Sequence, residues 1–184
     1  MTVPNILTLI RIALVPVFLL FAGRGMNIAT MIVFIAAAIT DTADGMIARK
    51  YNQITDFGKL FDPLADKLLV MAAVLVFVAR GEIPVWAATL LLGREFAVTS
   101  LRMIAATKGI VMAAGISGKL KTFTQCVSIA LMLFLWDNHP VLYGRATVQW
   151  LCVFLMTLLS LISCVDYFVR NGHVLKGSLS KKEN

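Results

Sequence analysis

The chain has few of the side chains from which zinc sites are built. It contains three cysteines and two histidines among 184 residues. Cys126, Cys152 and Cys164 are widely spaced in apolar runs, and no C-x-x-C pair is present. His139 and His173 lie outside those runs without ligand spacing. A zinc site is therefore not expected.

Charge is scarce as well, and acidic charge most of all. Charged residues make up 15% of the chain and hydrophobic residues 59%, and the mean hydropathy is +0.85. These values exclude an ordinary soluble domain and favour a bundle of membrane-spanning helices. The 17 Lys and Arg exceed the 10 Asp and Glu, which indicates either anionic partners or basic cytoplasmic loops. We expect no nucleic-acid partner.

Long apolar runs are present instead. Six of them are long enough to cross about 30 Å of hydrocarbon, near residues 5–23, 28–48, 58–79, 84–106, 118–136 and 146–169. The expected fold class is an all-α integral membrane protein with six transmembrane helices, and residues 1–184 are expected to form one domain. The first run is similar to a signal peptide, but Arg11 interrupts it and no Lys or Arg precedes that residue, so we expect a retained helix.

The positions of Lys and Arg predict how these helices are oriented. If both termini are cytoplasmic, eleven basic residues fall on the inner side: Arg49, Lys50, Lys59, Arg102, Lys108, Lys119, Lys121, Arg170, Lys176, Lys181 and Lys182. The outer side then holds three: Arg24, Arg80 and Arg145. Near the outer ends of predicted helices lie Trp86, Trp136 and Trp150, where such rings suit an interface. We therefore expect a multi-pass protein with both termini cytoplasmic, and an N-terminus without targeting features suits a bacterial cytoplasmic (inner) membrane.

Four of the ten acidic residues lie inside two neighbouring predicted helices. Asp41 and Asp44 are spaced i, i+3, and Asp62 and Asp66 are spaced i, i+4, so each pair shares one helix face. All four lie roughly 6 to 12 Å from the inner helix ends at about 1.5 Å per residue. The alternative, charges that reach out to water from helix ends, fits Asp56 in the loop. For four carboxylates at matched depth a functional site is the better interpretation.

Four carboxylates that share a pocket of low dielectric must take up protons or bind cations. Oxygen ligands without nearby His or Cys favour one or two divalent cations, Mg²⁺ or Mn²⁺. Beside them, Gly45 and Ala48 leave room for a bulky polar group, and Arg49 offers a fork suited to phosphate. This combination indicates chemistry on a diphosphate.

The stretch fits the pattern D-x-x-D-G-x-x-A-R-x8-G-x3-D-x3-D over 26 residues. Its eight fixed positions are Asp41, Asp44, Gly45, Ala48, Arg49, Gly58, Asp62 and Asp66. The pattern resembles the signature of the CDP-alcohol phosphotransferase family. That resemblance implies a six-helix membrane fold, usually homodimeric, in which two divalent cations grip the diphosphate of a CDP-linked lipid.

The resemblance also implies residue roles. The metal ligands would be Asp41, Asp44, Asp62 and Asp66, and Asp66 would act as the general base on the acceptor hydroxyl. The sequence shows no Ser or Cys nucleophile paired with a nearby histidine, which agrees with direct attack by the acceptor.

Contacts to the CDP portion are implied for a second set of residues. Gly45, Arg49 and Thr55 would bind the CDP group of CDP-diacylglycerol. Asn5, in the opening "PNILTLIR", resembles a further contact on the nucleotide side.

Basic residues in the second half of the chain predict where the acceptor binds. Arg94 and Arg102 are eight residues apart and near one helix face. Together with Lys119 and Lys121 they could bind a phosphate on the acceptor, which favours sn-glycerol 3-phosphate over serine or choline. Two alternatives stay open. Arg94 could form a structural ion pair with another helix, since Glu95 is expected to point elsewhere. The two lysines could be ordinary basic residues at the cytoplasmic end of a membrane helix.

The overall layout resembles the branch of the family that uses sn-glycerol 3-phosphate, through the segments "NILTLIRI", "FDPLADKLLV", "GREF" and "GKLKT". Relatives that accept inositol phosphate or phosphatidylglycerol remain alternatives. Membrane prenyltransferases also pair aspartate motifs with Mg²⁺, but they would not need Gly45, Arg49 and Gly58. A divalent-cation transporter is disfavoured because the outer halves of the second and third runs offer no polar route.

Overall fold

The computed structural model describes residues 3–51, 56–107, 110, 112, 115–136 and 145–171, and side chains within 9–40, 67–106, 110, 112, 115–136 and 146–171. In these parts the regular structure is helical. The helices are α1 (Val3–Gly23), α2 (Asn27–Tyr51), α3 (Asp56–Ala79), α4 (Val85–Thr107), α5 (Ile116–Leu135) and α6 (Arg145–Asn171). The prediction of an all-α protein is confirmed.

Each helix begins and ends within three residues of an apolar run found in the sequence. The turns between α1 and α2 and between α3 and α4 contain Gly25 and Gly81, whose φ angles of 71° and 73° favour glycine. Within the described residues, two helical stretches have both the length and the apolar composition to cross a membrane, Ile116–Leu135 and Ala146–Asn171. Six membrane crossings stay a prediction.

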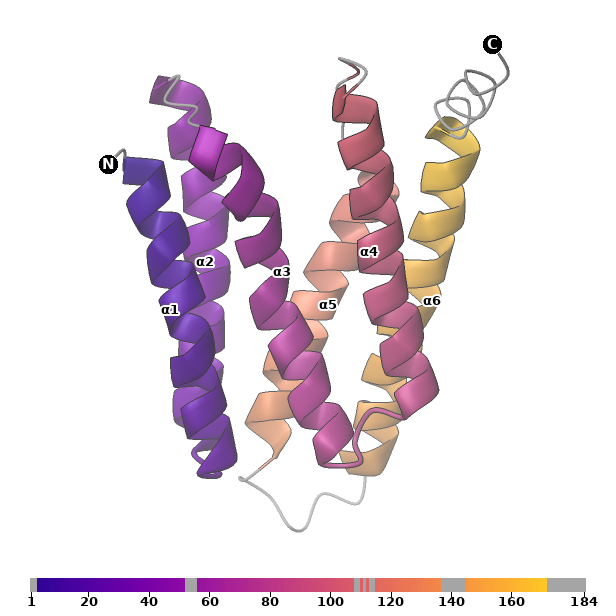
Figure 1. Ribbon diagram of the computed structural model, residues 1–184. Coiled ribbons are helices and arrows are strands. Elements are labelled where there is room, and N and C mark those ends of the chain that lie inside the picture. The colour runs from indigo at the N-terminus through magenta and orange to yellow at the C-terminus, as the bar shows by residue number, and fades with distance from the viewer. Residues whose placement is uncertain are drawn as a thin grey trace.

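The helices run up and down in one bundle (Figure 1). The most extensive packing joins α1 to α2 and α3, and α5 to α6, while α4 packs on α6 and α2 on α5. The start of α1, the end of α2, the start of α3 and the ends of α4 and α6 lie at the same end of the bundle (Figure 1). This end is the predicted cytoplasmic one, and both aspartate pairs belong to it.

The bundle carries apolar side chains outward and several polar ones inward. On α6, the side chains of Leu151, Phe154 and Val169 are exposed, whereas Ser160 and Ser163 are buried. An apolar outer face is unfavourable in water but not in the hydrocarbon of a membrane. Small polar residues often lie between packed membrane helices. The distribution supports the membrane assignment.

A cluster of contacts fixes the opposite end of the bundle. Arg80 donates to the backbone oxygen of Ala22 at the end of α1 and to Oδ1 of Asn27 at the start of α2, 3.2 Å away. Its guanidinium also lies 3.0 Å from the centroid of the Trp136 ring, a favourable cation–π contact. Phe77 stacks on the same ring. The cluster ties α3 to three other parts of the bundle.

The three tryptophans predicted to lie at a membrane interface differ in their exposure. Trp86 and Trp150 are exposed. Trp136 is half-buried because Arg80 and Phe77 cover its ring. Trp136 is therefore a packing residue of this end of the bundle.

Candidate functional site

The backbone that carries the four aspartates is helical. Asp41 and Asp44 belong to α2, and Asp62 and Asp66 belong to α3, so the predicted spacings of one helical turn are retained. Their side chains lie outside the described residues. Whether the carboxylates meet around cations therefore stays a prediction.

The predicted contacts to the CDP group also fall mainly outside the described part. Asn5 lies on α1, and Gly45 and Arg49 lie on α2, but the side-chain surroundings of these residues are outside the description. Thr55 lies outside the described residues altogether. Their roles stay predictions.

Next to the aspartate segment, the structure contains a cavity of about 770 Å³ lined by residues of α1 to α5. One of these residues, Lys67, directly follows Asp66 in α3. The cationic side chains among the described lining residues are Arg11, Lys67, Arg94, Arg102, Lys119 and Lys121. All four residues predicted for the acceptor site are thus in the wall of a single cavity.

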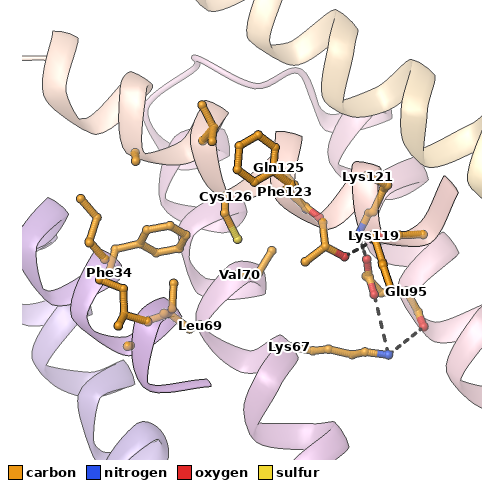
Figure 2. Close-up of a pocket in the computed structure, with 18 of the residues that line it drawn as sticks. Phe34, Lys67, Leu69, Val70, Glu95, Lys119, Lys121, Phe123, Gln125 and Cys126 are labelled. Atoms are coloured by element: carbon orange, nitrogen blue, oxygen red, sulfur yellow. Dashed lines mark hydrogen bonds and ion pairs between the residues drawn. The ribbon is translucent and has the colours of Figure 1, made fainter. Parts of the chain in front are cut away.

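Another part of the cavity wall is apolar. Figure 2 shows Phe34 of α2 and Leu69 and Val70 of α3 on the side of the cavity away from Lys119 and Lys121. The cavity is therefore basic on one side and apolar on the other. Such a cavity suits a ligand with a charged group and an apolar or uncharged remainder.

Glu95 of α4 lies at the centre of the basic part. Its Oε1 accepts a hydrogen bond from Nζ of Lys121 and lies 3.4 Å from Nη1 of Arg94. Its Oε2 lies 3.7 Å from Nζ of Lys67, and Figure 2 shows the two lysines approaching it from α3 and α5. Among the described residues that line the cavity, Glu95 is the single carboxylate.

The expectation that Glu95 points away from Arg94 was wrong. Neighbours on a helix diverge by about 100°, but the long side chains of Arg94 and Glu95 bend toward each other, and Nη1 reaches Oε1. The ion pair of Arg94 in the described part is therefore with its own neighbour on α4, and not with another helix. The ion pairs that do join different helices are those of Glu95 with Lys121 and Lys67.

Both arginines predicted to bind phosphate also donate hydrogen bonds to neutral groups of α6. Nη2 of Arg94 donates to Oγ of Ser163 at 2.7 Å. Nε of Arg102 donates to the hydroxyl of Tyr167 at 3.1 Å, and its guanidinium lies 5.3 Å from that ring. Nε of Arg94 is buried without a hydrogen-bond acceptor among the described residues. The neutral partner of Arg102 orients its guanidinium and leaves most of its charge for an anion, whereas Arg94 also pairs with Glu95.

The two lysines of α5 have different environments. Lys121 is 3% exposed and bonded to Glu95, so it is not an ordinary flanking charge of a membrane helix. Lys119 is exposed on the first turns of α5 while still lining the cavity. The positive-inside explanation therefore remains suitable for Lys119 only.

Sequence reasoning missed three charged residues of the cavity wall: Arg11, Lys67 and Glu95. Each interrupts an apolar run, and ionisable residues inside membrane helices are functional by default. That signal was present for Arg11, but we used Arg11 only to distinguish the first apolar run from a signal peptide. Lys67 was given no role because we assigned the role in this segment to its neighbour Asp66.

The cavity has the chemistry of an anion site. Its described wall contains six cationic side chains and one carboxylate. Cations in a partly apolar enclosure attract phosphate far more strongly than they would in water. The two arginines add planar donors that match phosphate oxygens.

The predicted metal site has a donor set that fits a hard divalent cation. The predicted ligands Asp41, Asp44, Asp62 and Asp66 lie on helical backbone beside this cavity. Their oxygen-only donor set suits Mg²⁺ or Mn²⁺. Elsewhere, the described side chains contain no group of three or more His, Cys, Asp or Glu that could hold a metal ion.

Comparison with known proteins gives a consistent result. A sequence profile described as CDP-alcohol phosphatidyltransferase matches residues 1–166. The CDP-diacylglycerol–glycerol-3-phosphate 3-phosphatidyltransferase of Bacillus subtilis is 38% identical over 190 aligned positions, which cover 95% of this chain and 97% of the relative.

Two other relatives extend the comparison to different bacteria. A probable phosphatidylglycerophosphate synthase of Mycobacterium tuberculosis H37Rv is 41% identical, over 90% of this chain and 79% of the relative. A CDP-diacylglycerol–glycerol-3-phosphate 3-phosphatidyltransferase of Rickettsia prowazekii is 34% identical, over 90% of this chain and 92% of the relative. The similarity therefore extends well beyond the aspartate motif.

Proposed function

Because this chain belongs to the CDP-alcohol phosphatidyltransferase family, we propose that it is the enzyme that transfers a phosphatidyl group from CDP-diacylglycerol to sn-glycerol 3-phosphate. The products are phosphatidylglycerophosphate and CMP, which makes the chain an enzyme of phospholipid biosynthesis. The names of its relatives support the reaction. The observation that carries the acceptor assignment is the basic cavity that begins one residue after Asp66.

The acceptor must carry an anionic group to match this cavity. The phosphate of sn-glycerol 3-phosphate bears close to two negative charges at neutral pH, whereas serine is a zwitterion. Arg94 and Arg102 supply guanidinium donors, and Lys121 supplies a buried ammonium. Glu95 balances only one of these charges, so an uncharged or zwitterionic acceptor would leave the excess positive charge uncompensated.

The reaction requires a base and stabilisation of a leaving nucleotide. In the proposed mechanism Asp66 removes the proton of the acceptor hydroxyl, whose oxygen forms a bond to the phosphatidyl phosphorus as the bond from phosphorus to the CMP oxygen breaks. Asp41, Asp44, Asp62 and Asp66 would hold two divalent cations, which supply charge neutralisation at the phosphate oxygens. Asn5, Gly45, Arg49 and Thr55 would bind the CDP group.

Chelation should remove the activity reversibly. We expect the rate of CMP release to fall by at least about 100-fold when divalent cations are removed with EDTA, because the charge on the diphosphate would no longer be neutralised. Dialysis followed by Mg²⁺ or Mn²⁺ should restore the rate. Zn²⁺, which favours N and S ligands, should restore it poorly. Full turnover in EDTA would contradict the proposed metal requirement.

The apolar outer faces and the predicted charge distribution support a multi-pass protein of the bacterial cytoplasmic membrane. The proposed site then faces the cytoplasm, where both termini are expected to lie. This places the basic cavity within reach of a water-soluble acceptor, while CDP-diacylglycerol arrives from the bilayer. The homodimer implied by the family resemblance stays a prediction that light scattering of the detergent-solubilised protein would test.

An acceptor screen tests the proposed reaction and the proposed side of the membrane together. Sealed vesicles that expose the cytoplasmic face should release CMP from CDP-diacylglycerol when sn-glycerol 3-phosphate is added outside. Vesicles of the opposite orientation should be at least about tenfold slower until detergent is added, since the bilayer excludes a charged acceptor. Release of CMP with inositol phosphate, serine or phosphatidylglycerol, and not with sn-glycerol 3-phosphate, would overturn the acceptor assignment.

A further inference from the structure

Glu95 is a carboxylate in a place where the proposed function calls for cations. It is 8% exposed, and the other charged side chains in the described wall of the cavity are cationic. A buried carboxylate that repels the substrate of its own site needs a reason. The contacts of Glu95 supply one, and the inference drawn from them rests on the proposed function.

The carboxylate draws together cations from three helices. Lys121 of α5 donates to Oε1, Arg94 of α4 lies 3.4 Å from the same oxygen, and Lys67 of α3 lies 3.7 Å from Oε2. Lys67 also donates to Oγ1 of Thr99, which is itself bonded to the backbone oxygen of Glu95. Without a negative charge at this point, the three cations would repel one another inside a poorly hydrated space.

These contacts have the form of an anion complex. Two oxygens of one acidic group receive cationic donors from several directions, as two oxygens of a phosphate would. A phosphate that enters the cavity needs the same donors, so it must compete with the carboxylate for them. A carboxylate carries one charge and a phosphate close to two, which favours the phosphate in that competition.

We infer that Glu95 is a positioning residue that makes the acceptor site selective for a phosphate dianion. Its carboxylate holds Lys121, Arg94 and Lys67 in place and yields Lys121 and Arg94 to the phosphate of the acceptor. Singly charged anions and zwitterions bring too little charge to displace it. The selectivity therefore comes from the competing carboxylate of Glu95. It lowers the affinity of the site for every anion, so that anions with a single charge no longer bind.

Binding measured without turnover tests this role separately from the reaction. The probes are inorganic phosphate and D-glycerate, a monoanion with three carbons, and the proteins are the unsubstituted chain and Glu95→Gln in detergent. The glutamine keeps the shape of the side chain and removes its charge. We expect Glu95→Gln to bind phosphate at least about fivefold more tightly, and to bind D-glycerate measurably where the unsubstituted protein does not, because the competing charge is gone.

Asp166→Asn is the matched control. Asp166 is also an acid on a membrane helix, but its partners are Ser117 and Arg170, and it is not part of the described cavity wall. We expect its dissociation constant for phosphate to stay within about twofold of the unsubstituted protein. Weaker or unchanged phosphate binding by Glu95→Gln would overturn the inference, since a merely structural glutamate would give that result.

A measurement on the unsubstituted protein covers the case in which Glu95→Gln does not fold. A structure determined with bound phosphate should show Nζ of Lys121 on a phosphate oxygen and no longer within hydrogen-bond distance of Oε1 of Glu95. A bound phosphate that leaves the Lys121 to Glu95 contact intact would overturn the inference. If phosphate binds as expected and sn-glycerol 3-phosphate still gives no CMP, the proposed reaction fails while the role of Glu95 stands.

Discussion

The substitution Asp66→Asn is expected to lower the rate of CMP release by about 1,000-fold or more, within the range that a general base contributes. Asparagine has nearly the same size as aspartate and cannot accept the proton of the acceptor hydroxyl. We expect the dissociation constant for CDP-diacylglycerol, measured with the labelled lipid in the presence of Mg²⁺, to change by less than about threefold, since three other predicted ligands remain. The effect therefore belongs to the chemical step.

The matched control is Asp56→Asn, in the same segment of the chain but outside the eight-position motif. We expect it to retain the rate of the unsubstituted protein within about twofold. A normal rate for Asp66→Asn would remove Asp66 from the role of base. A loss of CDP-diacylglycerol binding that parallels the loss of rate would show instead that Asp66 serves mainly to bind the nucleotide lipid.

The second large effect is expected at the acceptor side of the site. Arg94→Ala should raise the KM for sn-glycerol 3-phosphate by at least about tenfold, since a hydrogen bond to a charged group contributes roughly 1.5 to 3 kcal/mol. Lys121→Ala should act in the same direction and also leave Glu95 without its closest partner. The KM for CDP-diacylglycerol should change by less than about twofold, because neither residue belongs to the predicted CDP contacts.

Arg170→Ala provides the comparison for both substitutions. Arg170 is an exposed cation of α6 whose side chain pairs with Asp166 one turn earlier. Exposed pairs of this kind contribute little, so both KM values should stay within about twofold of the unsubstituted protein. Equal increases in the two KM values for Arg94→Ala would mean that the arginine supports the bundle, through Ser163, and does not bind the acceptor.

Charge inside apolar runs was the most informative feature of the sequence. It predicted the aspartate motif and four members of the basic cavity, because carboxylates and guanidinium groups are too costly in hydrocarbon to be present without a role. The same feature marks Arg11, Lys67 and Glu95, each of which also interrupts an apolar run. All seven charged residues of the described cavity wall are therefore of a kind that sequence alone can identify.

The contacts within the cavity were not predictable in the same way. Glu95 is 26 residues from Lys121 and 28 residues from Lys67. A helical repeat relates residues on one helix only, so it gives no information about the register between two helices. The interpretation of Arg94 and Glu95 as pointing apart was wrong for a related reason, since a helical wheel gives the direction of Cβ and not the reach of a flexible side chain.

The helices of this protein and the contacts between them are therefore determined by different parts of the information in the chain. The sequence alone determined the six helices, their limits and the placement of the aspartate motif on α2 and α3, because apolar run length and the helical repeat are local properties of the chain. The tertiary structure alone decided that cations from α3, α4 and α5 meet at one carboxylate. The physical reason is that the rotation and offset between packed helices depend on side chains that are distant in the sequence.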